Sequence, residues 1–240
     1  MKIIALGDTH GRTVWKEIVS NTEFDKVVFT GDYFDSREYI SAEQQKTNFK
    51  EIVAFKKANM NKVVLLFGNH EYHYIKTREG IYSGYQSIHS EYFKKMLQKA
   101  MAEKLIQMCH VHEKFIFSHA GITKTWLKST GYSGEENLES FINALFYSNP
   151  QAFKFTRGEN HSNDGNDICQ SPIWVRPDSL YKDAIENYTQ VAGHTEQIDI
   201  EINEVATLID TLGISGQYLE ILDGIMAVKE QNILVKKNSN

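Results

Sequence analysis

Residues of the types that can bind metal ions follow several apolar segments of this sequence. The first apolar segment, KIIAL, is followed by GDTHG, which places Asp8 and His10 two residues apart between glycines. Residues two apart in an extended segment project to the same side, so these two side chains are able to hold one ion. Four similar polar blocks follow later apolar segments, and they read GDYFD (31–35), GNHE (68–71), SHAG (118–121) and GHT (193–195).

The blocks contain six candidate metal ligands that are carboxylates, imidazoles and one amide, with no thiolate: Asp8, His10, Asp32, Asn69, His119 and His194. Such a set suits manganese first, with iron or zinc as alternatives, better than a calcium or magnesium cage. Six ligands exceed the three or four of a typical single zinc site, so we expect two divalent ions. Two ions roughly 3.5–4 Å apart, bridged by one carboxylate, clamp the attacking and leaving oxygens of an in-line displacement at phosphorus. The residues therefore predict metal-dependent phosphoester hydrolysis.

The apolar segments are predicted to be the strands that position these ligands. Five of them stop at polar, glycine-bearing turns, and they span 2–6, 26–30, 62–67, 114–118 and 189–193. Apolar positions at helical spacing predict helices over 13–20, 39–59, 90–108 and 135–147. The first third is a βαβαβ pattern, which implies a parallel sheet. Because the carboxyl ends of such strands line the ligand crevice, the five polar blocks are expected to meet there.

The end of the chain has a different pattern. Short strand candidates at 205–211, 217–223 and 224–230 have close turns and predict a second, more antiparallel sheet. Residues 156–171 are polar and rich in turn formers, which predicts a long surface loop. No internal repeat or proline-rich linker divides the chain. We therefore predict one domain over residues 1–240, with an α/β fold of two packed mixed β-sheets flanked by helices.

Composition and charge argue against several classes of protein. The chain has 240 residues and a formal net charge of −5, which argues against a general nucleic-acid or membrane-surface binder. Cys109 and Cys169 show neither disulfide nor thiolate-zinc spacing. The N-terminal apolar run is too short for a signal peptide, and no run approaches the roughly 18 residues of a spanning helix. We expect a soluble, cytoplasmic protein.

Taken together and in order, GDTHG, GDYFD, GNHE, SHAG and GHT resemble the signature of the calcineurin-like metallophosphoesterases over residues 7–195. GDTHG, GNHE and the lone GH resemble the phosphoprotein-phosphatase branch, in which a GHxH ending is reduced to GH, and Glu196 occupies the second histidine position here. SPIWVRP (171–177) and LIDT (208–211) are similar to later blocks of that branch. The resemblance implies a four-layer αββα sandwich and a serine/threonine phosphatase.

The resemblance also implies roles for the metal ligands. In the family pattern, Asp8 and His10 hold the first ion and Asp32 bridges the pair. Asn69, His119 and His194 then hold the second ion.

The same resemblance implies that His70 is the general acid. It protonates the leaving alkoxide while water activated by the two ions attacks phosphorus directly, and Asp35 orients the His70 ring and keeps it protonated. A carboxylate partner is chemically reasonable, because an imidazolium beside two dications needs one to stay charged.

The sequence departs from the family at its phosphate-binding arginine. The family usually has GDxxDRG, but GDYFDSR places Ser36 at the arginine position and displaces Arg37 by one. Neighbouring residues in an extended segment point in opposite directions. Arg176 is therefore the better phosphate clamp, because a guanidinium offers two parallel hydrogen bonds to phosphate, and Arg37 is a second candidate.

Three functions remain open for this sequence. The first is a phosphomonoesterase of the serine/threonine phosphatase type acting on phosphoprotein, and the second is hydrolysis of a dinucleoside polyphosphate or other nucleotide at the same centre. The third is a non-catalytic scaffold, which is disfavoured because His70 and every ligand are present.

Other candidates are given weaker roles. The remaining histidines are expected to be surface or structural residues: His73, His89, His110, His112 and His161. Arg12 is at least as well explained as a solvated side chain as it is by contact with substrate. The tyrosines after GNHE are expected to fill core positions rather than form a substrate-facing rim: Tyr72, Tyr74, Tyr82 and Tyr85.

Overall fold

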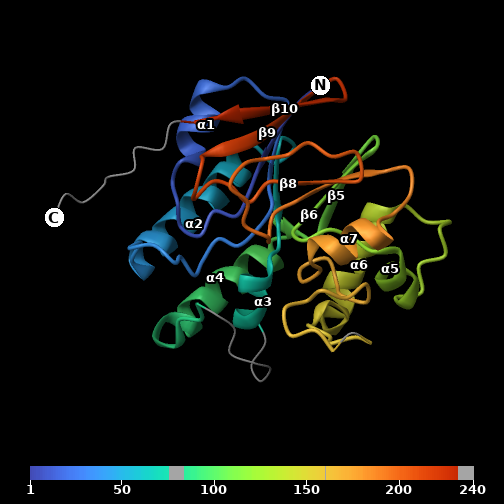
Figure 1. The fold of residues 1–240 in the computed structure, drawn as a ribbon. Helices are drawn as coiled ribbons and strands as arrows, with labels where there is room; N and C mark the ends of the chain where they lie inside the picture. The colour runs from blue at the N-terminus through green and yellow to red at the C-terminus, as the bar shows by residue number, and fades with distance from the viewer. Residues whose placement is uncertain (76–83, 160, 232–240) are drawn as a thin grey trace.

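Two β-sheets pack against each other at the centre of the molecule, and helices cover their outer faces (Figure 1). The computed structural model describes residues 1–75, 84–159 and 161–231. The α/β architecture of two mixed sheets flanked by helices agrees with the prediction from the sequence. Within the described residues, no helix combines the length and apolarity needed to cross a membrane.

The larger sheet has six strands in the order β10-β9-β1-β2-β3-β4. The four strands from β1 to β4 run parallel, whereas β9 is antiparallel to β1 and β10 is antiparallel to β9. The strands are β1 (Lys2–Leu6), β2 (Lys26–Phe29), β3 (Val63–Leu66), β4 (Ile106–Gln107), β9 (Gln217–Leu222) and β10 (Ile225–Glu230).

The smaller sheet has four strands in the order β5-β6-β7-β8. β5 pairs antiparallel with β6, and β6, β7 and β8 run parallel. The strands are β5 (Cys109–His112), β6 (Phe115–Ser118), β7 (Thr189–Ala192) and β8 (Ala206–Leu208). The last three strand candidates were expected in a second, more antiparallel sheet, but only β8 lies there, in parallel with β7, whereas β9 and β10 pair antiparallel in the larger sheet. β1 is buried inside the larger sheet and needs a hydrogen-bonding neighbour on each side, and β9 supplies the second one.

Seven α-helices and two short 3₁₀ helices occupy the described residues. They are α1 (Trp15–Asn21), α2 (Ala42–Ala58), α3 (Asn69–Ile75), α4 (Ser90–Ala102), α5 (Lys124–Ser129), α6 (Leu138–Ser148), α7 (Pro177–Asp183), η1 (Ser87–His89) and η2 (Pro150–Phe153). α2 begins at a capping box, in which Ser41 and Gln44 each satisfy a backbone N–H of the other. The helix predicted over 90–108 ends at residue 102, because the chain then extends into β4.

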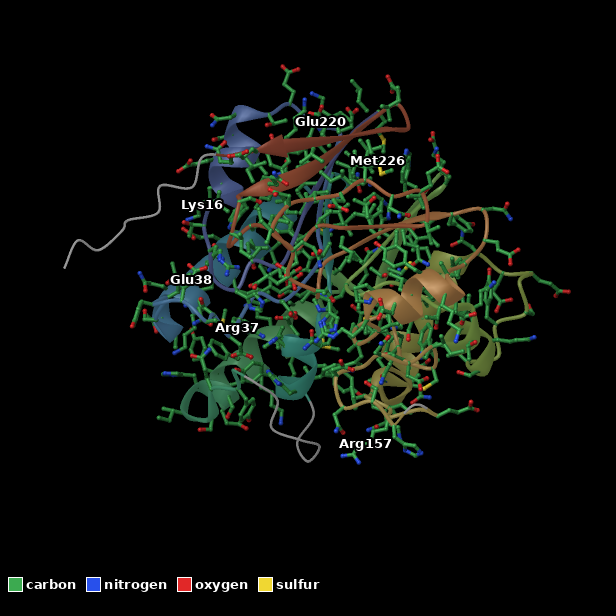
Figure 2. The ribbon with its side chains drawn as sticks, in the orientation of Figure 1. Lys16, Arg37, Glu38, Arg157, Glu220 and Met226 are labelled. Atoms are coloured by element: carbon green, nitrogen blue, oxygen red, sulfur yellow. The ribbon has the colours of Figure 1, made fainter. Side chains whose placement is uncertain are left out.

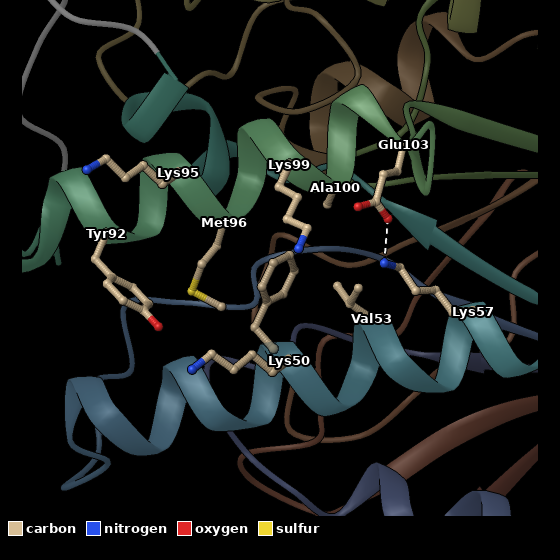
Figure 3. A pocket seen from close by; sticks show the side chains of 10 residues that line it. Lys50, Val53, Lys57, Tyr92, Lys95, Met96, Lys99, Ala100 and Glu103 are labelled. Carbon is tan, nitrogen blue, oxygen red and sulfur yellow. Dashed lines mark ion pairs between the residues drawn. The ribbon is translucent and has the colours of Figure 1, made fainter.

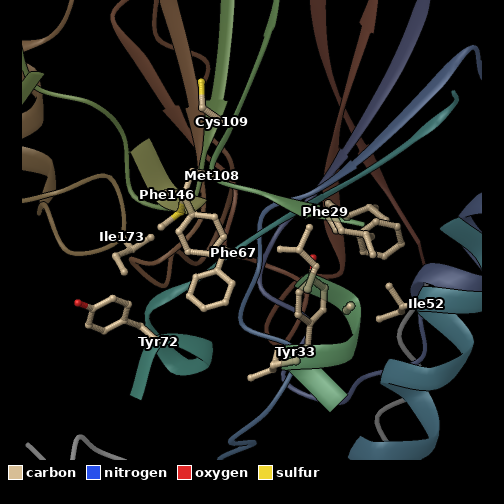
Figure 4. Packing of buried hydrophobic residues seen from close by; sticks show 14 of the residues in the cluster. Phe29, Tyr33, Ile52, Phe67, Tyr72, Met108, Cys109, Phe146 and Ile173 are labelled. Atoms are coloured by element: carbon tan, nitrogen blue, oxygen red, sulfur yellow. The ribbon is translucent and has the colours of Figure 1, made fainter. Parts of the chain in front are cut away.

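Alternating residues of the central strands face two different apolar cores. Ile3 of β1 packs between the sheets, in a cluster that includes Phe117 of β6. Ile4 points to the other side and belongs to the cluster beneath the helices, with Phe29 of β2 and Ile52 of α2 (Figure 4). A strand buried on both faces reads as a continuous apolar run, which explains KIIAL and its relatives. These fully buried strands fix the positions of the polar turns that follow them.

A separate groove of about 380 Å³ lies between α2 and α4 (Figure 3). Val53 and Met96 form part of its apolar lining, and four lysines stand at its edges: Lys50, Lys57, Lys95 and Lys99. Its one carboxylate, Glu103, lies 2.5 Å from Nζ of Lys57 in an ion pair. The lining contains no histidine. This groove therefore lacks the donor set of a metal centre.

Candidate metal centre

The six predicted ligands meet where the strands of both sheets end. Asp8 and His10 follow β1, Asp32 follows β2, Asn69 begins α3 after β3, His119 follows β6 and His194 follows β7. Contacts across the group are short: the backbone N–H of His194 donates to Oδ2 of Asp8 at 2.9 Å. Residues 186 positions apart in the chain thus contact each other. The crevice at the strand ends brings together the residues that the sequence analysis placed there.

Asp32 lies at the centre of the group. Its Oδ2 is 3.5 Å from Nε2 of His119, 3.9 Å from Nε2 of His10 and 3.9 Å from Nε2 of His70. Two sets of three possible ligand atoms share this residue: one adds His10 and His70, and the other adds Asp8 and His119. Within each set the atoms lie within 4.8 Å of one another. Asp32 is therefore in the position that a carboxylate bridging two ions requires.

Asn69 joins the two histidines of the smaller sheet. Its Oδ1 lies 2.8 Å from Nε2 of His119 and 2.9 Å from Nδ1 of His194. The amide oxygen and the two imidazole nitrogens are all able to donate a lone pair to a cation. The arrangement supplies three ligand atoms at one point.

The backbone carbonyl of Thr30 fixes the tautomer of His119. Its Nδ1 lies 2.9 Å from the carbonyl oxygen of Thr30, which accepts only, so Nδ1 carries the hydrogen. Burial lowers the pKa of His119, so the ring is neutral. The lone pair of Nε2 then faces the oxygens of Asn69 and Asp32. Electron pairs that face one another in this way are what a bound cation stabilises.

His10 shows the same pattern on the other side of Asp32. Its Nδ1 lies 2.6 Å from the carbonyl oxygen of Phe34, and burial lowers the pKa of His10 to about 4. The neutral ring therefore presents its Nε2 lone pair toward Asp32. Both imidazoles are oriented and deprotonated as metal ligands need to be, so the donor set fits two divalent ions.

Negative charge is concentrated in the same place. Burial, followed by the charges of Asp210 and Asp32, raises the pKa of Asp8 well above its usual range. Burial and the charge of Asp32 also raise the pKa of Asp210, to about 7. Ionised carboxylates at this density need compensating positive charge. Divalent ions would supply it.

Four predicted site residues have left-handed backbone conformations. The φ angle is 43° at His10, 50° at Asp32, 62° at Asp35 and 66° at His194. Such angles are uncommon for residues other than glycine, and they are concentrated at functional sites, where surrounding structure maintains the strain. Each occurs in the sharp turn that follows a strand, so the strain accompanies the placement of these side chains in the crevice.

Gly68 and Gly193 are required because a carboxylate packs directly against each of them, and not because of their backbone conformation. A β-carbon on Gly68 would lie 2.1 Å from Oδ1 of Asp32, and one on Gly193 would lie 2.0 Å from Oδ1 of Asp8. No side chain fits at these distances. The glycines of GNHE and GHT therefore allow two carboxylates to pack against the backbone.

Asp35 and His70 form a pair beside the cluster. Nδ1 of His70 lies 3.0 Å from Oδ2 of Asp35. Burial alone would lower the pKa of His70, but the charges of Asp32 and Asp35 raise it to about 9. Burial opposes ionisation of Asp35, but hydrogen bonds from His70 and His73 outweigh it and lower the pKa of Asp35 to about 2. A protonated His70 therefore carries its second N–H at Nε2.

The ligand cluster opens into a cavity of about 230 Å³. Both predicted phosphate-binding residues, Arg37 and Arg176, line it. Arg176 is anchored by the carbonyl oxygens of Asp164 (2.8 Å) and His194 (3.3 Å). Arg37 is exposed on the loop that leads into α2, beside Glu38 (Figure 2). Of the two predicted phosphate contacts, Arg176 is thus anchored and Arg37 is exposed.

Several site residues were not assigned by the sequence analysis. Glu196 and Asp210 line the cavity, and so does Arg12, for which the sequence left the role open. Asp210 follows the short strand β8, so the strand-end rule that identified the other blocks would have found it. Glu71, the last residue of GNHE, accepts hydrogen bonds from the backbone N–H groups of Asp32, Tyr33 and Gly68 and joins two of the turns.

The histidines and tyrosines that were given weaker roles from the sequence lie in different parts of the structure. His73 was expected at the surface or in a structural role; it is not at the surface but buried, and its Nε2 lies 2.8 Å from Oδ2 of Asp35. The other histidines with such expectations do not line the cavity: His89, His110, His112 and His161. Tyr72 and Tyr74 are core residues as expected, and Tyr82 lies outside the described residues.

Comparison with known proteins places this geometry in context. The sequence model of the calcineurin-like phosphoesterases matches residues 1–195. No curated protein sequence matches the chain.

Solved structures show the same fold. A cold-active protein tyrosine phosphatase superposes with a TM-score of 0.62 and 17% identity, covering 95% of this chain and 77% of that one. A protein serine/threonine phosphatase from Saccharomyces cerevisiae gives 0.57 and 14%, covering 97% and 81%. A metallophosphoesterase from Sphaerobacter thermophilus gives 0.53 and 12%, covering 97% and 89%. At these identities the likeness concerns the fold.

Proposed function

The chain belongs to the calcineurin-like phosphoesterase family, and we propose that within this family it is a phosphomonoesterase of the serine/threonine phosphatase type. Family membership makes the protein a metal-dependent phosphoester hydrolase with a dinuclear centre of divalent ions. The substrate class, the metal and the roles of individual residues are our proposals. We also propose that residues 1–240 act as one domain, because both sheets contribute side chains to one site.

The observation that carries the proposal is the arrangement around Asp32. Two clusters of ligand atoms share its carboxylate, and imidazoles with fixed tautomers face it from both sides. We assign Asp8, His10 and Asp32 to the first ion, and Asp32, Asn69, His119 and His194 to the second. Manganese is the ion we expect, with iron or zinc as alternatives, because the ligands mix oxygen with imidazole nitrogen. When bound, two such ions lower the pKa of water to supply a nucleophile and neutralise charge at phosphorus.

The protein's own groups account for the remaining needs of the reaction. His70 lines the cavity, and because Asp35 binds its Nδ1, we assign the proton at Nε2 to the leaving oxygen. Asp35 binds the opposite nitrogen of the ring and so fixes its direction. Arg176 has hydrogen-bond donors anchored by backbone oxygens and is suited to bind phosphate oxygens, with Arg37 as the more exposed second contact.

The phosphoprotein reading agrees with the names of two proteins of similar fold, which are described as protein phosphatases. The cavity of about 230 Å³ is small, and it is lined by three arginines: Arg12, Arg37 and Arg176. A single phosphoryl group on a protruding side chain fits such a space. We expect the rest of a phosphoprotein to lie outside it.

A panel of substrates tests the proposal. Protein loaded with Mn²⁺ is assayed with phosphoserine, phosphothreonine and phosphotyrosine peptides and with dinucleoside tetraphosphates. We expect phosphate release from the phosphoserine and phosphothreonine peptides. Activity confined to the dinucleotides would reject the protein-phosphatase reading in favour of the nucleotide hydrolase. Activity confined to phosphotyrosine would move the specificity to that class.

Metal content distinguishes an enzyme from a scaffold. We expect two ions per chain in protein purified with manganese, and anomalous scattering at several metal edges would count and identify them. Less than one equivalent, together with no release of product from para-nitrophenyl phosphate, would favour the non-catalytic scaffold.

A further inference from the structure

The Asp35 carboxylate receives more hydrogen bonds than the orientation of one histidine requires. Its side chain is fully buried, and its Oδ2 accepts from Nδ1 of His70 at 3.0 Å and from Nε2 of His73 at 2.8 Å. Its Oδ1 accepts from the hydroxyl of Tyr74 and from Nε2 of Gln86 at 3.0 Å. Four donors occupy the lone-pair positions of one carboxylate. Asp35 is therefore held on both oxygens.

Three of these donors come from one face of α3. His70, His73 and Tyr74 are spaced at i, i+3 and i+4, and residues at this spacing lie next to one another on a helix surface. The helix therefore presents the proposed acid and two further donors to the same carboxylate. A substitution at His73 or Tyr74 would therefore affect the orientation of His70 through Asp35.

The fourth donor returns from a different part of the chain. Gln86 precedes η1, and its backbone N–H donates to the Tyr74 hydroxyl at 3.1 Å. Its side-chain Nε2 also donates to Oε1 of Gln45 on α2 at 3.0 Å, and the same oxygen accepts from the backbone N–H of Asp35 at 2.8 Å. These bonds tie α2, α3 and the turn of Asp35 together.

Packing restricts the same groups. The ring of Tyr85 stacks on Tyr74, with centroids 5.1 Å apart and planes at 25°, and contacts the edge of His73 at 5.1 Å. A β-carbon on Gly84 would lie 3.1 Å from Cβ of Asp35 and 3.5 Å from Cε1 of His70. Gly84 and Tyr85 thus pack against the Asp35–His70 pair and its donors, which leaves the donor rings little freedom to rotate.

We propose that His73 and Tyr74 are positioning residues, which hold the Asp35 carboxylate in the one orientation that directs Nε2 of His70 at the leaving group. The inference rests on the proposed role of His70 as general acid. Neither His73 nor Tyr74 lines the cavity, and both donate to Asp35, although the ring of His73 also lies edge-on to that of His70 with centroids 5.4 Å apart. Loss of either donor leaves one lone pair of a buried carboxylate unsatisfied, so Asp35 rotates and the His70 ring loses its fixed direction.

Two aryl phosphates that differ only in the leaving group test this role. Dinitrophenolate leaves without protonation, whereas phenolate leaves from phenyl phosphate with help from the acid. For His73→Leu and Tyr74→Phe, we expect kcat on phenyl phosphate to fall about tenfold, part of the roughly 10²–10⁴-fold that a general acid contributes. On 2,4-dinitrophenyl phosphate, kcat should fall less than about twofold, and KM should stay within about twofold for both esters.

A conservative variant and a matched control complete the test. His73→Gln retains an N–H that reaches Asp35, so it should recover most of the lost rate on phenyl phosphate. Tyr72→Phe removes a hydroxyl from the same helix, but that hydroxyl donates to the carbonyl oxygen of Pro150 at 3.1 Å and not to Asp35. We expect its ratio of the two rates to equal that of the wild type.

Equal losses on the two esters, or no loss in either variant, would overturn the proposal. Bound metal is measured in every variant, since loss of ions slows both esters together and so counts against positioning. Tyr74→Phe removes one oxygen atom and decides the matter if His73→Leu does not fold. Wild-type protein that cleaves both aryl esters but no phosphoserine peptide would reject the serine/threonine proposal, and the ratio test would still stand.

Discussion

Gly193 and Asp8 are in such close contact that a β-carbon at position 193 would lie 2.0 Å from Oδ1 of Asp8. Gly193 follows β7 of the smaller sheet, and Asp8 follows β1 of the larger one. The two sheets therefore meet at this contact, beside the candidate metal centre. A side chain at position 193 would therefore displace the carboxylate of Asp8, which is a proposed metal ligand.

Gly193→Ala is expected to weaken metal binding by about 10–100-fold, because the methyl group displaces the carboxylate of a proposed ligand. Titration calorimetry with Mn²⁺ measures the change. Gly224→Ala is the control: its β-carbon meets nothing within 4 Å, but its φ of 81° is unfavourable for alanine. That variant should lose about 1–2 kcal/mol of stability and keep its ions. Unchanged metal affinity in Gly193→Ala would contradict the proposed role of Asp8.

Much of the site was predictable from the sequence because one local rule covers it. Each of Asp8, Asp32 and His194 follows an apolar segment at a polar turn, and parallel strands bring such turns to one edge. The rule needs neither the order of the strands nor their exact ends. It works best at β1 and β2, which after their first lysine are buried and read as apolar runs, whereas β7 is equally buried but begins with the polar pair Thr189 and Gln190.

Features that depend on pairing between distant segments were not predictable. The apolar residues and close turns around 217–222 indicate a strand but do not say which neighbour it joins, so its place beside β1 was missed. The contact between His73 and Asp35 depends on how α3 packs against the turn after β2. A histidine three residues after His70 has no distinguishing local signal, and this is why it was assigned to the surface or to a structural role.

Asp32→Asn is expected to abolish binding of both ions, because its Oδ2 faces both clusters. Asparagine tolerates the left-handed backbone at this position, so the fold should remain. Its amide N–H groups would donate to the lone pairs of His10 and His119, so the metal-free variant should be at least as stable as metal-free wild type. Metal analysis and thermal unfolding measure the two effects.

His194→Asn provides the comparison, since it removes a ligand of the second ion only. We expect it to retain about one ion per chain, whereas Asp32→Asn retains close to none. Two ions in Asp32→Asn would contradict the bridging position.

Stability should depend on pH through Glu139, which does not line the cavity of the metal centre. Burial opposes its ionisation, but hydrogen bonds from His110 (3.1 Å) and from the backbone N–H of Val111 (2.8 Å) outweigh it and lower the pKa of Glu139. A lowered folded pKa stabilises the protein above the unfolded value of about 4.3 and less as the pH falls below it. The pair joins α6 to β5.

The lowered pKa of Glu139 determines how the stability should change with pH. In metal-free protein, wild type should exceed Glu139→Gln in free energy of unfolding by on the order of 1 kcal/mol at pH 7, and the difference should shrink below about pH 4. Urea unfolding at several pH values measures it. Glu201→Gln, at an exposed position, controls for loss of a charge. A difference that stays constant with pH would contradict the assignment.

The two candidate phosphate contacts should differ in strength. Arg176 is anchored by backbone oxygens and Thr195, so its guanidinium is preorganised, whereas Arg37 is exposed. We expect Arg176→Ala to reduce kcat/KM by about 10–100-fold and Arg37→Ala by only a few-fold, because ordering a flexible side chain offsets part of its binding energy. Steady-state kinetics with a phosphoserine peptide compares them. A larger effect at Arg37 would mean that its one-residue displacement is compensated by the loop.

Replacement of His70 separates acid catalysis from metal binding. Its ring contacts Asp35, but its backbone N–H donates to Oδ1 of Asp32 at 3.0 Å, and His70→Asn preserves that bond. We therefore expect both ions to remain bound while kcat on phosphoserine peptide falls by roughly 10²–10⁴-fold. His112→Asn removes an imidazole from β5, outside the cavity lining, and should leave kcat unchanged. Nε2 of His70 lies 3.9 Å from Oδ2 of Asp32. Loss of metal from His70→Asn would therefore show that the imidazole serves as a metal ligand. The leaving group would then need another proton donor.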